Sequence, residues 1–266
     1  MAGDQRSASE AGRSGVAGGV SRLIVGMTSL PSRIDEIRPA LESLLDGDQP
    51  PDAIILSLPR VALRGSGEWN IPAFLSDPDW RGERVQVTWT DEDFGPGTKL
   101  LGALPLLDPG DVIVLADDDV RYRPTFLAGL ARAMHRSDGR AAFSYYAYRL
   151  GGLRIGQGCD GFAMRAADIG AARSFFDAYV AGTDLVFHDD LWISHFLATC
   201  GIVVRPVPLP PDTPLIYDQM HEIDALRYLT GALDRARLSR TEAARLRRVA
   251  PIPLRHRATL ALRRVR

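Results

Sequence analysis

The chain has 266 residues, of which 45% are hydrophobic and 24% are charged, and its formal net charge is −1. This is ordinary globular composition, with room for one large α/β domain or two small ones. No run of about 18 apolar residues occurs, which argues against a membrane-spanning helix. The two cysteines form no CxxC pair, which disfavours a disulfide scaffold or zinc ribbon and favours a reducing, cytoplasmic compartment.

Strand and helix patterns alternate through the first half of the chain. Residues 1–20 come before them and are mostly Gly, Ala, Ser and Arg, so we expect a disordered leader rather than a signal peptide. Runs of β-forming residues predict strands, and apolar residues at helical spacing predict helices. The expected strands are 22–28, 53–58, 85–90 and 112–115, and the expected helices are 34–45, 98–107 and one that begins at Pro124. Such alternation is typical of a parallel, doubly wound sheet, which binds its ligands at the carboxyl ends of the strands.

The second half of the chain is less regular. It predicts strands at 141–146 and 201–207, a glycine-rich loop at 156–161, a helix after the acidic pair at 189–190, and a final helix over 239–249 that begins with a capping box. We therefore divide the chain into a leader (1–20), one α/β domain (21–231) and a basic helical tail (232–266).

Three consecutive carboxylates, Asp117, Asp118 and Asp119, follow the expected strand at 112–115. Crowding three like charges is costly unless a cation neutralises them, and oxygen ligands favour Mg²⁺ or Mn²⁺. In an extended segment Asp117 and Asp119 point to one side and Asp118 to the other, into the sheet. The alternative interpretation is a solvated acidic turn.

Two cationic residues lie close to the predicted ligand edge. The chain has a single lysine, Lys99, beside 31 arginines. A compact ammonium can contact a phosphate where a guanidinium does not fit; otherwise Lys99 pairs with Asp91 or Asp93. Arg33 lies in the turn after the first strand, where it contacts a donor ligand or is a surface charge at the start of a helix.

Four segments in order resemble the GT-A glycosyltransferases, especially bacterial members of family 2. Residues 114–120 resemble a strand that ends in a DxD motif, 93–100 are similar to the glycine-containing helix entry upstream of it, 158–164 resemble the acceptor-side loop, and 188–193 resemble the downstream acidic motif. The resemblance covers residues 22–221. It implies a Rossmann-like, mostly parallel sheet with helices on both faces and a hexosyltransferase-type activity, which moves a sugar from a nucleotide-sugar to a hydroxyl of a glycan or lipid-linked acceptor.

The resemblance also implies how the donor is held. A departing diphosphate must be neutralised, and the implied cofactor is Mn²⁺ or Mg²⁺. The implied metal ligands are Asp119, Asp117 and the late histidine His221. The implied donor contacts are Arg33, Lys99, Asp117 and Thr28.

The acidic pair Asp189 and Asp190 supplies the candidates for a catalytic base. By resemblance Asp190 deprotonates the acceptor hydroxyl, and the other carboxylate is expected to cap the helix. The implied acceptor contacts are Asp160 and Gly161, although an aspartate between glycines also suits a simple turn. Tyr145, Tyr146 and Tyr148 are expected along the acceptor cleft, with at least one of them packed inward.

Three other functions fit parts of the pattern. A nucleotidyltransferase needs a glycine-rich loop after its first strand, and residues 29–33 contain no glycine. A phosphohydrolase needs a nucleophilic aspartate there, and residues 27–29 contain none. A non-catalytic protein that binds carbohydrate or a polyanion would keep the cleft but show no turnover.

The last 35 residues are strongly basic. Residues 232–266 hold eleven arginines against Asp234 and Glu242, a net +9, which leaves −10 for the rest of the chain. A solvated helix explains this, and so does contact with an anionic partner: the inner face of the cell membrane, a lipid-linked phosphate or nucleic acid. No aromatic residue is interleaved with these arginines, so nucleic-acid binding is not expected.

Overall fold

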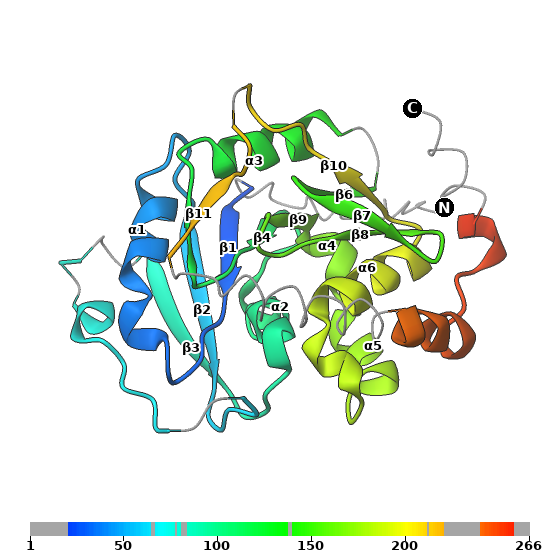
Figure 1. Cartoon of the computed structure of the whole chain (residues 1–266), viewed down its shortest axis with the longest axis horizontal. Coiled ribbons are helices and arrows are strands. Elements are labelled where there is room, and N and C mark those ends of the chain that lie inside the picture. Colours follow the sequence, from blue (N-terminus) through cyan, green and yellow to red (C-terminus); the bar gives the residue numbers. More distant parts are fainter. Residues whose placement is uncertain are drawn as a thin grey trace, which may run out of the picture.

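A seven-stranded sheet forms the centre of the molecule (Figure 1). The computed structural model describes residues 21–257 except 65–66, 78, 81–83, 138–139, 212 and 221–239. The strand order is β10-β6-β9-β4-β1-β2-β3, and all strands are parallel except β9, which is antiparallel to both of its neighbours. The strands are β1 (Leu23–Met27), β2 (Ala53–Pro59), β3 (Val85–Thr90), β4 (Val112–Leu115), β6 (Ala141–Ser144), β9 (Phe162–Arg165) and β10 (Val203–Pro206).

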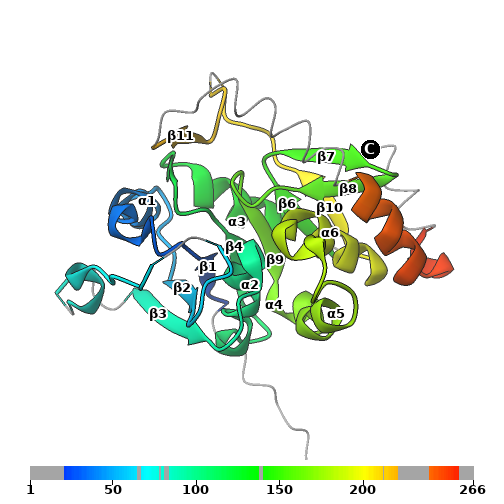
Figure 2. The same ribbon diagram turned by 60° about the horizontal axis from the view of Figure 1, so that its bottom comes forward.

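Helices cover both faces of this sheet (Figure 2). On one face lie α1 (Arg38–Leu45) and α3 (Phe126–Arg136). On the other lie α2 (Thr98–Leu101), α4 (Ala166–Ile169), α5 (Ala172–Tyr179) and α6 (Asp189–Thr199). The mostly parallel sheet with helices on both faces confirms the predicted α/β fold class.

The buried strands divide their side chains between two apolar layers. In β1, Val25 and Met27 pack with α1 and α3, whereas Ile24 packs with α2 and α6. All five residues of β1 and all seven of β2 are buried. A strand covered on both faces reads as a continuous apolar run, which is why these strands are visible in the sequence.

Several elements differ from the sequence-based expectation. The helix expected over 98–107 ends as α2 at Leu101 and continues as a 3-10 turn, Leu104–Leu106, because Pro105 offers no amide hydrogen to extend an α-helix. Two short antiparallel pairs were not predicted: β7 (Ala147–Leu150) with β8 (Leu153–Gly156), and β5 (Val120–Tyr122) with β11 (Tyr217–Gln219). Strands of three or four residues are too short to show a reliable period.

The expected leader and part of the expected tail lie outside the described residues. A helix at 240–249 is described, and its Leu246 is fully buried against the main core. None of the described helices has the length and apolar character that crossing a membrane requires.

Candidate active site

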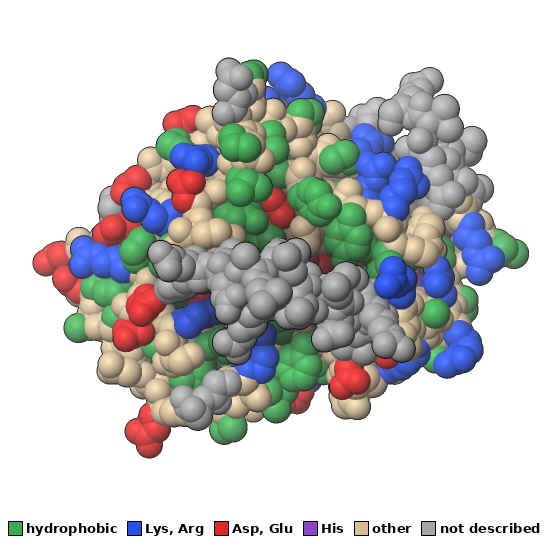
Figure 3. Space-filling model, viewed as in Figure 1, with side chains coloured by type: hydrophobic (Ala, Val, Ile, Leu, Met, Phe, Trp, Pro, Cys, Tyr) green, Lys and Arg blue, Asp and Glu red, His purple; other side chains and the backbone are tan. Residues whose placement is uncertain are grey.

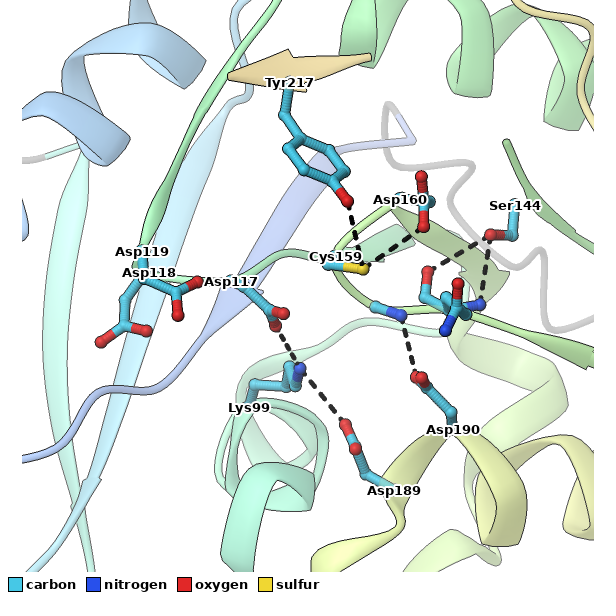
Figure 4. A network of polar contacts seen from close by, with 12 residues as sticks. Lys99, Asp117, Asp118, Asp119, Ser144, Cys159, Asp160, Asp189, Asp190 and Tyr217 are labelled. Atoms are coloured by element: carbon cyan, nitrogen blue, oxygen red, sulfur yellow. Dashed lines mark hydrogen bonds and ion pairs between the residues drawn. The ribbon is translucent and has the colours of Figure 1, made fainter. Parts of the chain in front are cut away.

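A cavity of about 240 Å³ lies at the carboxyl ends of β1 and β4. Five carboxylates and three cationic side chains line it, so it is strongly polar. Figure 4 shows the five carboxylates and one of the cationic side chains, Lys99. The lining residues are Thr28, Ser29, Leu30, Arg33, Arg64, Pro96, Lys99, Asp117, Asp118, Asp119, Gly158, Cys159, Asp189 and Asp190.

Lys99 connects the two acidic motifs of the chain. Its Nζ lies 2.6 Å from Oδ1 of Asp117, after β4, and 3.2 Å from Oδ2 of Asp189, at the start of α6. The Lys99 side chain is only 5% exposed. Burial alone would lower the pKa of Lys99, but Asp117, Asp189 and Asp190 outweigh it and raise that pKa well above the ordinary value. The buried ammonium is therefore charged and is held by carboxylates from both motifs.

Two glycines allow Lys99 to reach this position. A Cβ on Gly26 of β1 would lie 2.4 Å from the Lys99 carbonyl oxygen, so only glycine lets α2 approach the sheet so closely. A Cβ on Gly158 would lie 2.9 Å from Lys99 Nζ. Gly26 therefore requires the absence of a side chain, whereas a side chain at position 158 would displace the Lys99 ammonium.

A compact turn sets the start of α2. The Asp93 carboxylate accepts hydrogen bonds from the Gly95 amide at 2.7 Å and from the Thr98 hydroxyl at 3.3 Å. Gly95 has a φ of +60°, and a Cβ there would lie 2.5 Å from the Val186 carbonyl oxygen. Asp93 thus shapes the turn, and the alternative pairing of Lys99 with Asp91 or Asp93 is wrong.

Asp118 and Asp119 are both engaged by Arg33. The Arg33 guanidinium lies 2.6 Å from Asp118 Oδ1 and 2.7 Å from Asp119 Oδ2. Asp118 also accepts a short hydrogen bond from the Ser29 hydroxyl and is 3% exposed. Its burial raises its pKa to about 6, against the opposing effects of Arg33 and Ser29. Arg33 is therefore part of the cavity wall and not merely a surface charge at a helix start.

Asp117 and Asp119 retain access to the cavity. Their side chains are 31% and 34% exposed, and the Asp117 amide donates a 2.8 Å hydrogen bond to the Tyr122 hydroxyl, which fixes the start of the acidic turn. The ion pairs of Asp117 and Asp119 each use one carboxylate oxygen.

Asp117 and Asp119 suit a divalent ion whose coordination shell is completed by other ligands. Within the described residues no group of three His, Cys, Asp or Glu side chains forms a metal cage. Mg²⁺ is commonly held by one or two carboxylates together with water and substrate phosphates, and Asp117 and Asp119 can serve in this way. His221, the third predicted ligand, lies outside the described residues.

The acidic pair on α6 faces the cavity from the opposite side. Asp190 Oδ1 accepts a 2.8 Å hydrogen bond from the Gly158 amide, while Asp189 pairs with Lys99. No side-chain hydrogen bond caps α6, so the expectation that one of the two carboxylates caps this helix is wrong. Both carboxylates are instead committed to tertiary partners, although their place in the first turn still lets them interact favourably with the helix dipole.

The electrostatic environment of Asp190 suits proton transfer. Burial and the neighbouring Asp189 raise its pKa well above the ordinary value, against the lowering effect of Lys99. A carboxylate whose pKa is raised toward the working pH is a better general base.

Sequence reasoning missed Arg64, which lines the cavity from the loop after β2. Its guanidinium carbon lies 5.8 Å from the centre of the Phe187 ring, and it forms no ion pair with any described residue. The loop has no periodic pattern, so the sequence offers no signal that selects Arg64 from the other arginines. Cys159, also missed, lines the same cavity, and burial raises the pKa of its thiol.

Of the remaining predicted residues, Thr28 lines the cavity, whereas Asp160 and Gly161 are not among the lining residues. Asp160 is 8% exposed and accepts a hydrogen bond from the Cys159 thiol. Gly161 has a φ of +73°, and a Cβ there would lie 2.6 Å from the Phe126 ring. The structure therefore gives Gly161 a packing role against α3.

Comparison with known proteins gives a likeness to solved structures only. No protein-family model and no curated protein matches the chain. Glucosyl-3-phosphoglycerate synthase from Mycobacterium tuberculosis, in complex with phosphoglyceric acid, is 18% identical with a TM-score of 0.45, over 88% of this chain and 81% of that one. The same enzyme with Mn²⁺, uridine diphosphate and phosphoglyceric acid is 16% identical, with a TM-score of 0.46 over 88% and 80%.

S. aureus TarS 1–349 is 14% identical with a TM-score of 0.47, over 74% of this chain and 59% of that one. Because all three TM-scores lie below 0.5, these likenesses carry no conclusion about the activity of this chain. Any such conclusion rests on the residues of the cavity.

Proposed function

We propose that the chain is a metal-dependent glycosyltransferase that moves a sugar from a nucleotide-sugar to a hydroxyl of a glycan or lipid-linked acceptor. One observation carries the proposal: a buried lysine contacts both Asp117 and Asp189. The DxD-like turn and the acidic helix start, 72 residues apart, thereby face one cavity. The first suits a diphosphate with a divalent cation, and the second suits an acceptor hydroxyl.

The donor diphosphate is assigned to the cationic side chains of the cavity. Arg64 is free of ion pairs among the described residues, and Lys99 and Arg33 lie on either side of the acidic turn. Asp117 and Asp119 would hold Mn²⁺ or Mg²⁺, which neutralises the negative charge of a departing diphosphate. Thr28 lines the same wall and can hydrogen-bond the nucleotide.

Asp190 is assigned as the base that takes the proton of the acceptor hydroxyl. The Gly158 amide fixes one of its oxygens, and its raised pKa favours proton uptake. The acceptor oxygen then attacks the anomeric carbon of the donor as the bond to the diphosphate breaks. Lys99 lies between Asp117 on the donor side and Asp189 on the acceptor side, and its positive charge offsets part of the negative charge of these carboxylates.

Calorimetry and turnover of the full chain test this assignment. We expect nucleoside diphosphates to bind more tightly with Mn²⁺ than without it, and a panel of nucleotide-sugars to release nucleoside diphosphate slowly. Asp190→Asn should reduce this release roughly 10²–10⁴-fold and leave nucleotide binding intact. Asp177→Asn, which alters a half-exposed carboxylate on α5, is the matched control.

Two results would contradict the assignment. Full turnover by Asp190→Asn would remove the proposed base. Absence of binding by every nucleotide would favour the non-catalytic alternative, a protein that binds carbohydrate or a polyanion.

The basic C-terminal segment is assigned to an anionic membrane surface on the cytoplasmic side. Basic side chains gather around the C-terminal segment, at the right in Figure 3. Arg247, Arg248, Arg255 and Arg257 are exposed there, together with Leu254, which is 78% exposed. Arginines interspersed with an exposed apolar side chain suit the interface of an anionic bilayer.

A further inference from the structure

Tyr146, just before β7, and Tyr148, within it, have no role in the proposed mechanism so far. Tyr146 is 54% exposed, and its ring centre lies 6.3 Å from that of Tyr148, with 32° between the ring planes. The preceding residue, Tyr145, points the other way and donates a hydrogen bond to the Phe126 carbonyl. Tyr145 is thus the inward-packed member of the three, and the other two form a pair of rings, here called the tyrosine platform.

Hydrogen bonds link the tyrosine platform to the loop that lines the cavity, although neither tyrosine is itself a lining residue. The Ser144 hydroxyl bonds to the Tyr146 carbonyl at 2.8 Å and to the Gln157 carbonyl at 3.2 Å. The next residue, Gly158, lines the cavity and holds Asp190. A single hydroxyl therefore ties the platform to the loop that positions the proposed base.

The Tyr148 phenol lies within electrostatic range of Asp189 and Asp190. Strand β8, the partner of β7, packs directly on α6. The pKa of Tyr148 is raised to about 12, by burial first and then by the charges of Asp190, Tyr146 and Asp189. The packing of β8 on α6 and these charges together place Tyr148 on the α6 side of the molecule, near the acidic pair but not among the residues that line the cavity.

Neither platform hydroxyl has a hydrogen-bond partner in the described part of the chain. Neither hydroxyl is among the buried polar atoms that lack a partner, so both are open to a hydrogen bond from water or from a ligand. Exposed ring faces next to free hydroxyls suit a ligand with apolar C–H faces and many hydroxyls. A pyranose ring has both.

We propose that Tyr146 and Tyr148 form a carbohydrate subsite, in which a pyranose of the acceptor lies against the Tyr146 ring and hydrogen-bonds the Tyr148 hydroxyl beside Asp190. This inference rests on the proposed function and narrows its acceptor class from a glycan or lipid-linked hydroxyl to a sugar hydroxyl.

Saturation-transfer NMR with methyl glycosides of glucose, galactose and mannose tests the subsite without any need for turnover. We expect at least one glycoside to bind the full chain. Tyr146→Ala should weaken that binding roughly tenfold because it removes the ring face. Tyr148→Phe should weaken it about fivefold because it removes a hydrogen bond. Tyr146→Phe, which keeps the ring, should bind like the parent chain.

Trp89→Ala is the control, since it removes a 38% exposed ring on the edge strand β3. Binding that is equal in the parent chain and Tyr146→Ala, or absent for all three glycosides, would overturn the subsite. Nucleoside diphosphate binding, measured on the same samples, separates the two proposals. If glycosides bind through Tyr146 but no nucleotide binds, the carbohydrate subsite stands and glycosyl transfer does not.

Discussion

Replacing Lys99 by methionine should destabilise the chain and make its stability depend on pH. Methionine fills a similar volume but leaves Asp117, Asp189 and Asp190 without the ammonium between them. Removing one partner of a buried ion pair typically costs about 3–5 kcal/mol. Because the Asp117 side chain is 31% exposed and can be solvated, we expect the lower end, about 3 kcal/mol at pH 8.

The sign of the pH dependence follows from the carboxylates that remain. Without Lys99, the pKa of Asp190, already raised by burial and Asp189, rises further in the folded state. A folded-state pKa above the unfolded value means that the folded chain binds more protons, so its stability increases as pH falls through that range. The deficit of Lys99→Met relative to the parent chain should therefore shrink between pH 8 and pH 5.

Urea denaturation of both chains at pH 8 and pH 5 measures this deficit. Arg173→Met is the matched control, because its ion pairs with Asp177 and Glu92 are half-exposed and should contribute only about 0–1 kcal/mol. The double variant Lys99→Met/Asp189→Asn should recover part of the loss, since it removes one uncompensated carboxylate. A deficit below 1 kcal/mol, or one that does not change with pH, would refute the view that Lys99 neutralises this cluster.

Three further predictions concern separate parts of the molecule. Because the pKa of Asp118 is raised to about 6, the stability of the parent chain relative to Asp118→Asn should fall as pH rises from 4 to 6, by up to about 3 kcal/mol in denaturation experiments. Gly161→Ala should cost roughly 1–3 kcal/mol, because of both its positive φ and the contact with Phe126, and a melting temperature equal to that of the parent would contradict this. Vesicles that contain phosphatidylglycerol should sediment the chain while neutral phosphatidylcholine vesicles do not, and the variant Arg247→Gln/Arg248→Gln/Arg255→Gln should lose most of this binding; equal sedimentation by both lipids would remove the membrane assignment.

The sequence predicts the site residues that lie at the carboxyl ends of the strands. Asp117–Asp119 and Thr28 lie at one edge because parallel strands place their carboxyl ends together. Expectations drawn from neighbouring residues fail where a side chain binds a partner that is distant in the sequence. Helix capping was expected from the acidic pair on α6, but Lys99 and the Gly158 amide take both carboxylates instead.

Other parts of the site leave no local trace in the sequence. Arg64 reaches the cavity from an irregular loop, and the hairpin of β7 and β8 consists of strands of four residues each. Contacts such as these depend on which segments lie close together in three dimensions, and not on a local sequence pattern. The partner of Lys99 shows the same point: Asp91 and Asp93 are near it in sequence, but α2 turns the side chain toward Asp117 and Asp189.

The charge balance of the cavity links the metal to the donor. Among the described lining residues, five carboxylates face three cationic side chains, which leaves an excess of two negative charges when all are ionised. A nucleoside diphosphate is itself an anion, so this cavity repels it unless a divalent cation enters with it or carboxylates take up protons. The proposed function therefore requires that metal and nucleotide strengthen each other's binding by the same factor, since such coupling is reciprocal. Nucleotide affinity that is independent of Mn²⁺ at pH 8, where Asp118 is ionised, would mean that Arg33, Lys99 and Arg64 alone neutralise the diphosphate.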